Sequence, residues 1–135
     1  VDNVSEPADK VSFQFGMYPQ YNPSFEYDEN LQEYLRFYGK EKHIDQATGG
    51  QLRAANILVQ FTNYWVTDEE GRLEFKTYGS GKSLLFRDGK VFKGTWAKEQ
   101  GGVTRFLGEN GEEFALRAGQ TWIEVVNEEW RVKWE

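Results

Sequence analysis

The sequence contains no cysteine, a single histidine and three prolines in 135 residues. Without cysteine there is no disulfide, no thiol nucleophile and no thiolate ligand for a metal. One histidine excludes zinc centres built from two or three imidazoles, so only a carboxylate-rich metal site stays possible. The sequence also lacks an apolar run of about 18 residues, and it therefore predicts no transmembrane helix.

The charged side chains are unevenly distributed along a chain that carries 22 acidic and 16 basic residues, a net charge of −6. A negative chain is a poor ligand for nucleic acid, because nonspecific affinity for phosphates comes from lysine and arginine. Segment 82–98 is the exception, since Asp88 is its only acidic residue. Its basic residues form a candidate anion-binding surface or, alternatively, protect a sheet edge from aggregation. The candidate anion-binding residues are Lys82, Arg87, Lys90 and Lys93.

Short β-rich runs separated by glycine make up most of the chain. There are 14 glycines, 5 tryptophans, 7 tyrosines and 10 phenylalanines. Aromatic residues favour strands, and glycine favours the turns between them. We therefore expect a mainly β fold, in which antiparallel hairpins form a twisted, barrel-like or sandwich-like sheet with at most one short helix.

The clearest hairpin spans residues 83–96 and turns at Asp88-Gly89, a pair typical of two-residue type I′ turns. Counting outward from this turn places Phe86 opposite Val91. The other face of the hairpin is the more apolar one, and we predict that it lines the core. This face carries Leu85, Phe92 and Trp96.

Two further hairpins are predicted. A three-residue loop at 109–111 would place Phe106 opposite Phe114 and Gly111 in the left-handed conformation. Upstream, segments 56–66 and 72–78 flank an acidic turn and have the pattern of hairpin arms. The first of these arms is apolar almost throughout, as expected for a strand covered on both faces.

Segment 29–38 fits two patterns. Its apolar residues match the helical spacing, but they also match the alternation of a strand, and the aromatic content favours the strand. The following segment, 46–55, is too rich in glycine for more than one helical turn.

The sequence contains fragments of known motifs, but none is complete. Residues 79–83 end like a phosphate-binding loop, yet Lys76 stands where the first glycine should be, and a strand follows in place of a helix. Acidic turns at 28–30, 68–70 and 109–113 offer oxygen ligands without the spacing of a calcium loop. We therefore expect no metal and no cofactor.

Polar residues on adjacent elements could converge on one site. His43 and Asp45 share a face if they lie on a strand, so a hydrolase using His43 with Asp45 or Asp28 is one hypothesis. The sequence lacks the Gly-x-Ser-x-Gly elbow of many hydrolases, and we assign no catalytic residue. The candidate polar patch consists of Asp28, Arg36, His43 and Asp45.

Exposed aromatic residues suggest another possibility, because their rings could stack on sugars as in a carbohydrate-binding module. Packing inside the core is the alternative role for the same rings. The candidates are Tyr18, Tyr21, Tyr27, Tyr64 and Trp65.

A series of short motifs occurs in order along the chain. They are Tyr27-Asp28, Tyr34-Leu35-Arg36, His43-Ile44-Asp45, the run 56–60, Gly79-Ser80-Gly81, the run 86–90, Gly94-Thr95-Trp96 and the run 119–123. In order and spacing they resemble the C-terminal domain of the YerB-type lipoprotein family of Gram-positive bacteria. The resemblance divides the chain into a linker with a first strand (1–24), a β domain (25–126) and a C-terminal extension with a last strand (127–135).

The resemblance implies a longer natural protein, in which a secretion signal with a lipid-attached cysteine and an N-terminal domain precede this domain. Such a protein would be an extracytoplasmic lipoprotein whose only membrane contact is a lipid anchor absent from this chain. The activity of the family is unestablished. We therefore expect a noncatalytic binding or interaction domain, with an envelope hydrolase and a carbohydrate- or anionic-polymer-binding module as alternatives.

The expected partners follow from the same resemblance. They are the N-terminal domain of the same natural protein and a cell-envelope polymer or another envelope protein. Nucleic acid is not among them, because of the negative net charge.

Overall fold

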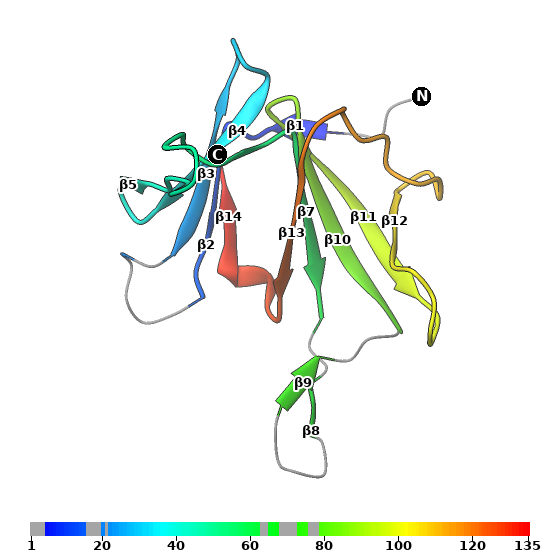
Figure 1. Ribbon diagram of the computed structural model, residues 1–135. Coiled ribbons are helices and arrows are strands. Elements are labelled where there is room, and N and C mark those ends of the chain that lie inside the picture. Colours follow the sequence, from blue (N-terminus) through cyan, green and yellow to red (C-terminus); the bar gives the residue numbers. More distant parts are fainter. Residues whose placement is uncertain (1–4, 16–19, 21, 63–64, 68–72, 76–78) are drawn as a thin grey trace.

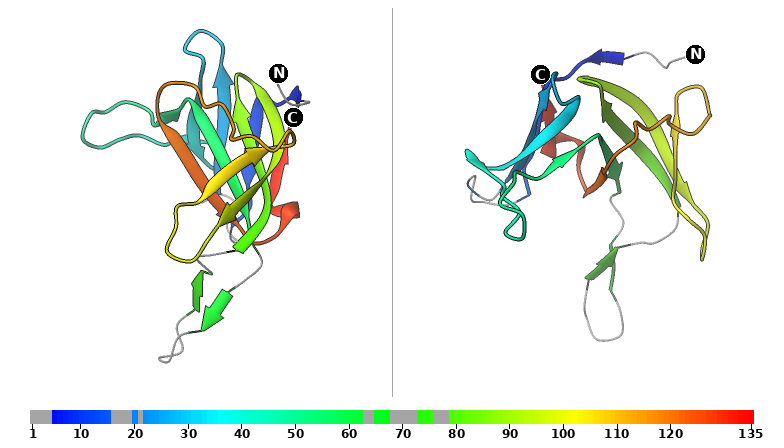
Figure 2. Two further views of the ribbon diagram at one scale, coloured as in Figure 1. Left: turned by 90° about the vertical axis from the view of Figure 1, so that its right-hand side faces the viewer. Right: turned by 45° about the horizontal axis from the view of Figure 1, so that its top comes forward.

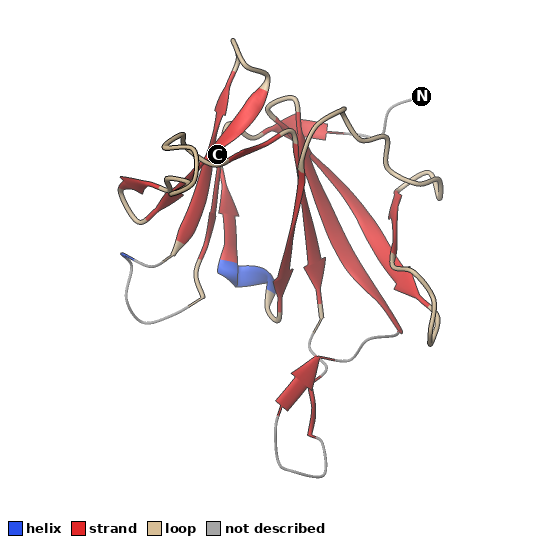
Figure 3. Cartoon of the chain, in the orientation of Figure 1, coloured by secondary structure: helices blue, strands red, loops and turns tan. Residues whose placement is uncertain are grey.

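The computed structural model describes residues 5–15, 20, 22–62, 65–67, 73–75 and 79–135. Nearly all of its regular structure is strand (Figure 3). Helical structure in these residues is limited to short 3-10 turns such as η2 (Glu129–Arg131). None of the described helical segments has the length and apolar character needed to span a membrane.

Two large sheets and one small sheet make up the fold (Figure 1). The first sheet has the strand order β1 (Ser5–Pro7), β11 (Lys90–Lys98), β10 (Gly79–Arg87), β7 (Asn56–Phe61) and β13 (Thr121–Val126), and β12 (Arg105–Gly108) also pairs with β11. The second has the order β14 (Val132–Trp134), β2 (Lys10–Phe13), β3 (Pro23–Asp28), β4 (Glu33–Tyr38) and β5 (Glu41–Lys42), and β6 (Arg53–Ala54) also pairs with β4. The small sheet consists of β8 (Trp65–Thr67) and β9 (Leu73–Phe75).

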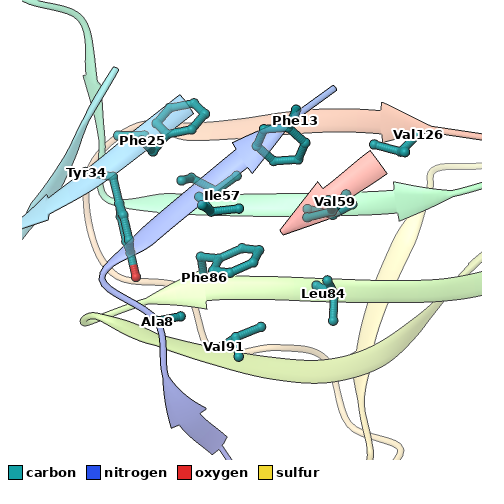
Figure 4. Packing of buried hydrophobic residues seen from close by; sticks show 13 residues of the cluster. Ala8, Phe13, Phe25, Tyr34, Ile57, Val59, Leu84, Phe86, Val91 and Val126 are labelled. Carbon is teal, nitrogen blue, oxygen red and sulfur yellow. The ribbon is translucent and has the colours of Figure 1, made fainter. Parts of the chain in front are cut away.

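The two large sheets face each other without closing into a barrel, as the right-hand view of Figure 2 shows. This confirms the mainly β prediction in its sandwich-like form. Ile57 and Phe86 of the first sheet point toward Phe13 and Phe25 of the second, and all four side chains are at most 1% exposed (Figure 4). The main core is therefore the layer between the sheets.

Tyr34 contributes to the same core and connects its two sides. Its ring lies on β4, and its hydroxyl accepts a hydrogen bond of 3.0 Å from the backbone N–H of Gly89, in the turn between β10 and β11. Burial raises the pKa of the Tyr34 hydroxyl, so it stays protonated. The second sheet is thereby attached to the end of the longest hairpin of the first.

The β10–β11 hairpin has the predicted register, with Phe86 opposite Val91. The predicted core face, that of Leu85 and Phe92, is buried, but it lines only a smaller cluster. The main core lies on the opposite face, because the second sheet packs there. The first sheet is thus covered on both faces; β12 and the segment after it cover the smaller cluster with Phe106 and Phe114.

The loop at 109–111 also forms as predicted. The N–H of Gly108 donates to the carbonyl of Glu112 at 2.8 Å, that of Phe114 donates to Phe106 at 3.0 Å, and Gly111 has a φ of 83°. Segment 29–38 is a turn followed by strand β4, in agreement with the aromatic content.

The predicted hairpin between 56–66 and 72–78 is wrong in its long arm. β7 pairs with β10 and β13, and only the short strands β8 and β9 pair with each other. The acidic turn between them, 68–71, lies outside the described residues. β7 lies between β10 and β13 in the first sheet, and both of its faces are covered. In a hairpin with the next segment alone, β7 would have a neighbour on one side only.

The parallel pairing of β13 with β7 was not expected from the sequence. It depends on Asn56, whose side chain is completely buried at the start of β7. This side chain accepts a hydrogen bond from the N–H of Arg117 at 2.9 Å and donates to the carbonyl of Arg117 at 2.8 Å. The amide thereby fixes the connection that brings β13 alongside β7.

Gly94 on β11 lies where β12 and Phe114 pack closely against the β10–β11 hairpin. A Cβ atom at this position would collide with the carbonyl oxygen of Leu107 and lie 2.6 Å from Cζ of Phe114. We expect Gly94→Ala to lower the free energy of unfolding by about 1–3 kcal/mol, because β12 must move away. Gly50→Ala is the matched control, since only Oγ1 of Thr48 lies near, at 3.6 Å. Equal unfolding curves of the two variants in denaturant would contradict this prediction.

Candidate functional site

Arg36 lies at the centre of the polar groups inside the sandwich. It is on β4, is 6% exposed, and extends from the second sheet to the first. Its Nη1 donates to Oε1 of Glu124 on β13 at 2.8 Å. The guanidinium also lies 4.1 Å from the ring centre of Trp122 and 5.0 Å from that of Phe25. The charge is therefore enclosed by a carboxylate and aromatic faces.

His43 is the second partner of Arg36. Its Nδ1 accepts a hydrogen bond of 3.1 Å from Nε of Arg36, and its ring lies 4.2 Å from that of Tyr38. Because the guanidinium is a donor only, Nδ1 must be unprotonated in this arrangement. Burial, followed by the charge of Arg36, lowers the pKa of His43.

The two aspartates of the predicted polar patch are engaged elsewhere. The carboxylate of Asp45 accepts from the N–H of Ala47 at 2.9 Å, inside its own turn. That of Asp28 accepts from the N–H groups of Asn30 and Leu31 at 2.9 and 3.0 Å. The structure thus brings Arg36 and His43 together, and it shows no hydrogen bond from His43 to either aspartate among the described residues.

Glu124 is the side chain of this cluster that the prediction from the sequence did not include. The alternation along β13 places it on the inward face, between Trp122 and Val126. A carboxylate at an inward position needs a buried cation. This signal was present in the sequence, but it did not indicate which cation, because Arg36 is 88 positions away.

The four predicted anion-binding residues divide between the two faces of the β10–β11 hairpin. Arg87 and Lys90 are paired on the outer face, where Nε of Arg87 contacts Asp88 at 3.1 Å. Lys82 and Lys93 lie on the inner face, at diagonal positions. The structure therefore does not bring the four into one surface.

Lys82 and Lys93 border an opening between the two sheets. β10 and β11 have nine residues each, whereas β14 has three, so the ends of the long strands extend past the second sheet. The opening has a volume of about 640 Å³ and is named the inter-sheet cleft. Its apolar lining consists of Phe61, Leu84, Val132 and Trp134.

The lining of the inter-sheet cleft contains two lysines, Lys82 and Lys93, and two glutamates, Glu109 and Glu129. Lys82 forms an ion pair of 3.4 Å with Glu129, in which both side chains are more than 60% exposed. Lys93 is exposed and has no ion pair in the part of the chain that the structure describes. An apolar interior beside a lysine can accept a molecule that has both an apolar part and an anionic group.

Other candidates from the sequence have structural roles or cannot be placed. Residues 79–83 are the start of β10, and the Tyr27 ring packs against Tyr34 at 4.9 Å. Tyr18, Tyr21 and Tyr64 and the side chain of Trp65 lie outside the described residues. Within the described residues, no three histidine or acidic side chains are grouped so that they could hold a metal ion.

Comparison with known proteins identifies the family. The model of a family described as "Protein of unknown function (DUF3048) C-terminal domain" matches residues 11–123. The chain belongs to this family. A curated relative is "Putative lipoprotein YerB" of Bacillus subtilis (strain 168), which is 26% identical over 102 residues. These matches confirm the resemblance seen in the sequence motifs.

A solved structure has the same fold. The crystal structure of the YerB protein from Bacillus subtilis superimposes with a TM-score of 0.81 at 21% identity, over 99% of this chain. The chain matches only 44% of that structure and 30% of the curated relative. The chain therefore spans less than half the length of these two relatives.

The buried pair of Arg36 and Glu124 gives a first prediction for this site. Glu124→Gln leaves a buried cation without its anion, and we expect the free energy of unfolding to fall by about 3–5 kcal/mol. In the double variant Arg36→Met, Glu124→Leu much of this loss is restored, because no buried charge is left. As the control, Glu26→Gln removes the exposed partner of Lys10, at 3.1 Å, and costs at most about 1 kcal/mol. A double variant that is no more stable than Glu124→Gln would contradict the argument.

His43 gives a second prediction. Because its pKa is lower in the folded than in the unfolded chain, the unfolded chain binds more protons near this pKa. The stability that the neutral ring contributes is complete above a pH of about 6.5 and is lost as the pH falls toward the folded pKa. His43→Asn retains an acceptor without titrating. From pH 8 to pH 5, we expect the denaturant midpoint of His43→Asn to fall less than that of the wild type. An equal fall of the midpoint in both proteins would contradict the prediction.

Proposed function

We propose that this domain is the noncatalytic binding domain of an extracytoplasmic, membrane-anchored lipoprotein. The observation that carries the proposal is the inter-sheet cleft, where apolar walls stand beside Lys93, which has no ion pair among the described residues. The name of the Bacillus subtilis relative supports the cellular location. The N-terminal part of such longer relatives and other envelope components are further candidate partners.

Hydrolysis has less support. A general base must have a free lone pair within reach of the proton that it removes. Nδ1 of His43 already accepts from Arg36, and the low pKa of the ring makes it a weak base. The carboxylates of Asp28 and Asp45 bind backbone N–H groups in their own turns, so neither orients His43.

The lining of the inter-sheet cleft indicates the chemistry of its ligand. A volume of about 640 Å³ is within the range of small-molecule sites. Leu84, Val132 and Trp134 favour an apolar group inside, and Lys93 favours a phosphate or carboxylate at the entrance. The exposed pair of Lys82 and Glu129 is worth little in water and opens easily. The proposed ligand is therefore an amphiphile with one anionic group.

Titration with octyl phosphate tests this proposal. We expect NMR shift changes at Leu84, Val132 and the Trp134 indole, and weaker binding of trimethyloctylammonium, whose charge is opposite. Lys93→Glu should weaken the binding of octyl phosphate about tenfold, since charge reversal at a partly solvated site costs about 1–2 kcal/mol.

Lys90→Glu is the matched control, because this lysine is exposed on the same hairpin but on its other face. We expect the affinity of the Lys90→Glu variant for octyl phosphate to stay within twofold of that of the wild type. Equal weakening by the two substitutions, or shifts confined to residues outside the inter-sheet cleft, would overturn the proposal.

A further inference from the structure

A row of four side chains, three polar and one aromatic, crosses the outer face of the second sheet. The strand register places Lys133, Ser12, Ser24 and Phe37 side by side on β14, β2, β3 and β4. These residues alternate with the buried Val11, Phe13 and Phe25, so they face away from the core. The row crosses three strand spacings, about 14 Å.

This face is concave. Two adjoining depressions of about 650 and 340 Å³ share Ser12, Ser24, Gly39 and Lys133, and together they form what is named the outer trough. The serines form its floor because they are smaller than Phe37 and Lys133, which stand at either end of the row. The outer trough lies on the opposite side of this sheet from the main core, because its row alternates with the core residues Val11, Phe13 and Phe25.

The outer trough is basic on an acidic protein. Its lining has four basic side chains, Lys10, Lys40, Arg131 and Lys133, and two acidic ones, Glu26 and Glu135. Glu26 is paired with Lys10 at 3.1 Å, and Arg131 is paired with Glu128 at 3.5 Å. Lys40 and Lys133 are exposed, and within the described residues neither has an ion pair. With a net charge of −6 on the chain, this concentration of positive charge can attract an anion locally.

We propose that the outer trough binds a strand of an anionic, hydroxyl-rich polymer, a sugar or polyol chain with phosphate or carboxylate groups. Lys40 and Lys133, which have no ion pair in the described part of the chain, attract its charges. The serine hydroxyls of the floor exchange hydrogen bonds with its hydroxyls, and the half-buried ring of Phe37 packs against its apolar edges. Nucleic acid fits less well, because successive bases need several stacking rings and Phe37 is the only aromatic residue in the row.

This site shares only Trp134 with the lining of the inter-sheet cleft and contains none of the anion-binding residues predicted in the sequence. Lys82 and Lys93 are on the inner face of the first sheet, whereas the outer trough belongs to the second sheet. The inference therefore stands if octyl phosphate fails to bind at Lys93.

The test uses calorimetry at low salt with four probes. These are tetragalacturonate as the carboxylate form, a glycerol phosphate oligomer as the phosphate form, maltotetraose as a neutral glycan and a short thymidine oligonucleotide. We expect one or both anionic probes to bind and to shift the NMR signals of Ser12, Ser24 and Phe37. The affinity should fall as the salt concentration rises. Maltotetraose and the oligonucleotide should bind at least tenfold more weakly.

Variants with equal net charge separate the site from general attraction. The double variant Lys40→Glu, Lys133→Glu should bind the anionic probe at least tenfold more weakly than the wild type. The double variant Lys90→Glu, Lys98→Glu should bind the same probe with an affinity within twofold of the wild type. Both doubles exchange lysines outside the core, and circular dichroism verifies that they fold. Equal weakening by the two doubles, no binding of either anionic probe to the wild type, or tighter binding of the oligonucleotide would overturn the proposal.

Discussion

The contact between the inner faces of the two large sheets is the constraint on which the rest of the structure depends. Ile57 and Phe86 on one side and Phe13 and Phe25 on the other exclude water from the space between them. Burial of these side chains is the main favourable contribution to folding. The same dry layer lets Arg36 and Glu124 interact strongly, because nearby water would otherwise screen their charges.

The two candidate binding surfaces arise from unequal strand lengths and from alternation. The inter-sheet cleft exists because nine-residue strands face a three-residue strand, so part of an apolar face has no cover. The outer trough exists because every second residue of the second sheet must face away from its core. One surface is thus continuous with the interior and partly apolar, whereas the other is polar and basic.

Local features of the sequence predicted local structure well. Asp88-Gly89 predicted the register of β10 and β11, because a turn fixes the pairing of the strands beside it. For the same reason, the sequence of 109–111 predicted the loop that brings Phe114 back to Phe106. The pairing of β7 with β13 and the approach of Glu124 to Arg36 depend on residues far apart in the chain, and no turn encodes them. The choice of the main core face also depended on where a distant sheet packs.

The pairing of β14 with β2 joins the two ends of the chain, with Trp134 opposite Val11. On the ribosome, the N-terminal strands are made long before their final neighbour exists. β2 is therefore the edge strand of the second sheet until β14 has been made, and the large sequence separation of this pairing slows folding. During that time the unpaired backbone groups of β2 are open to pairing with other chains.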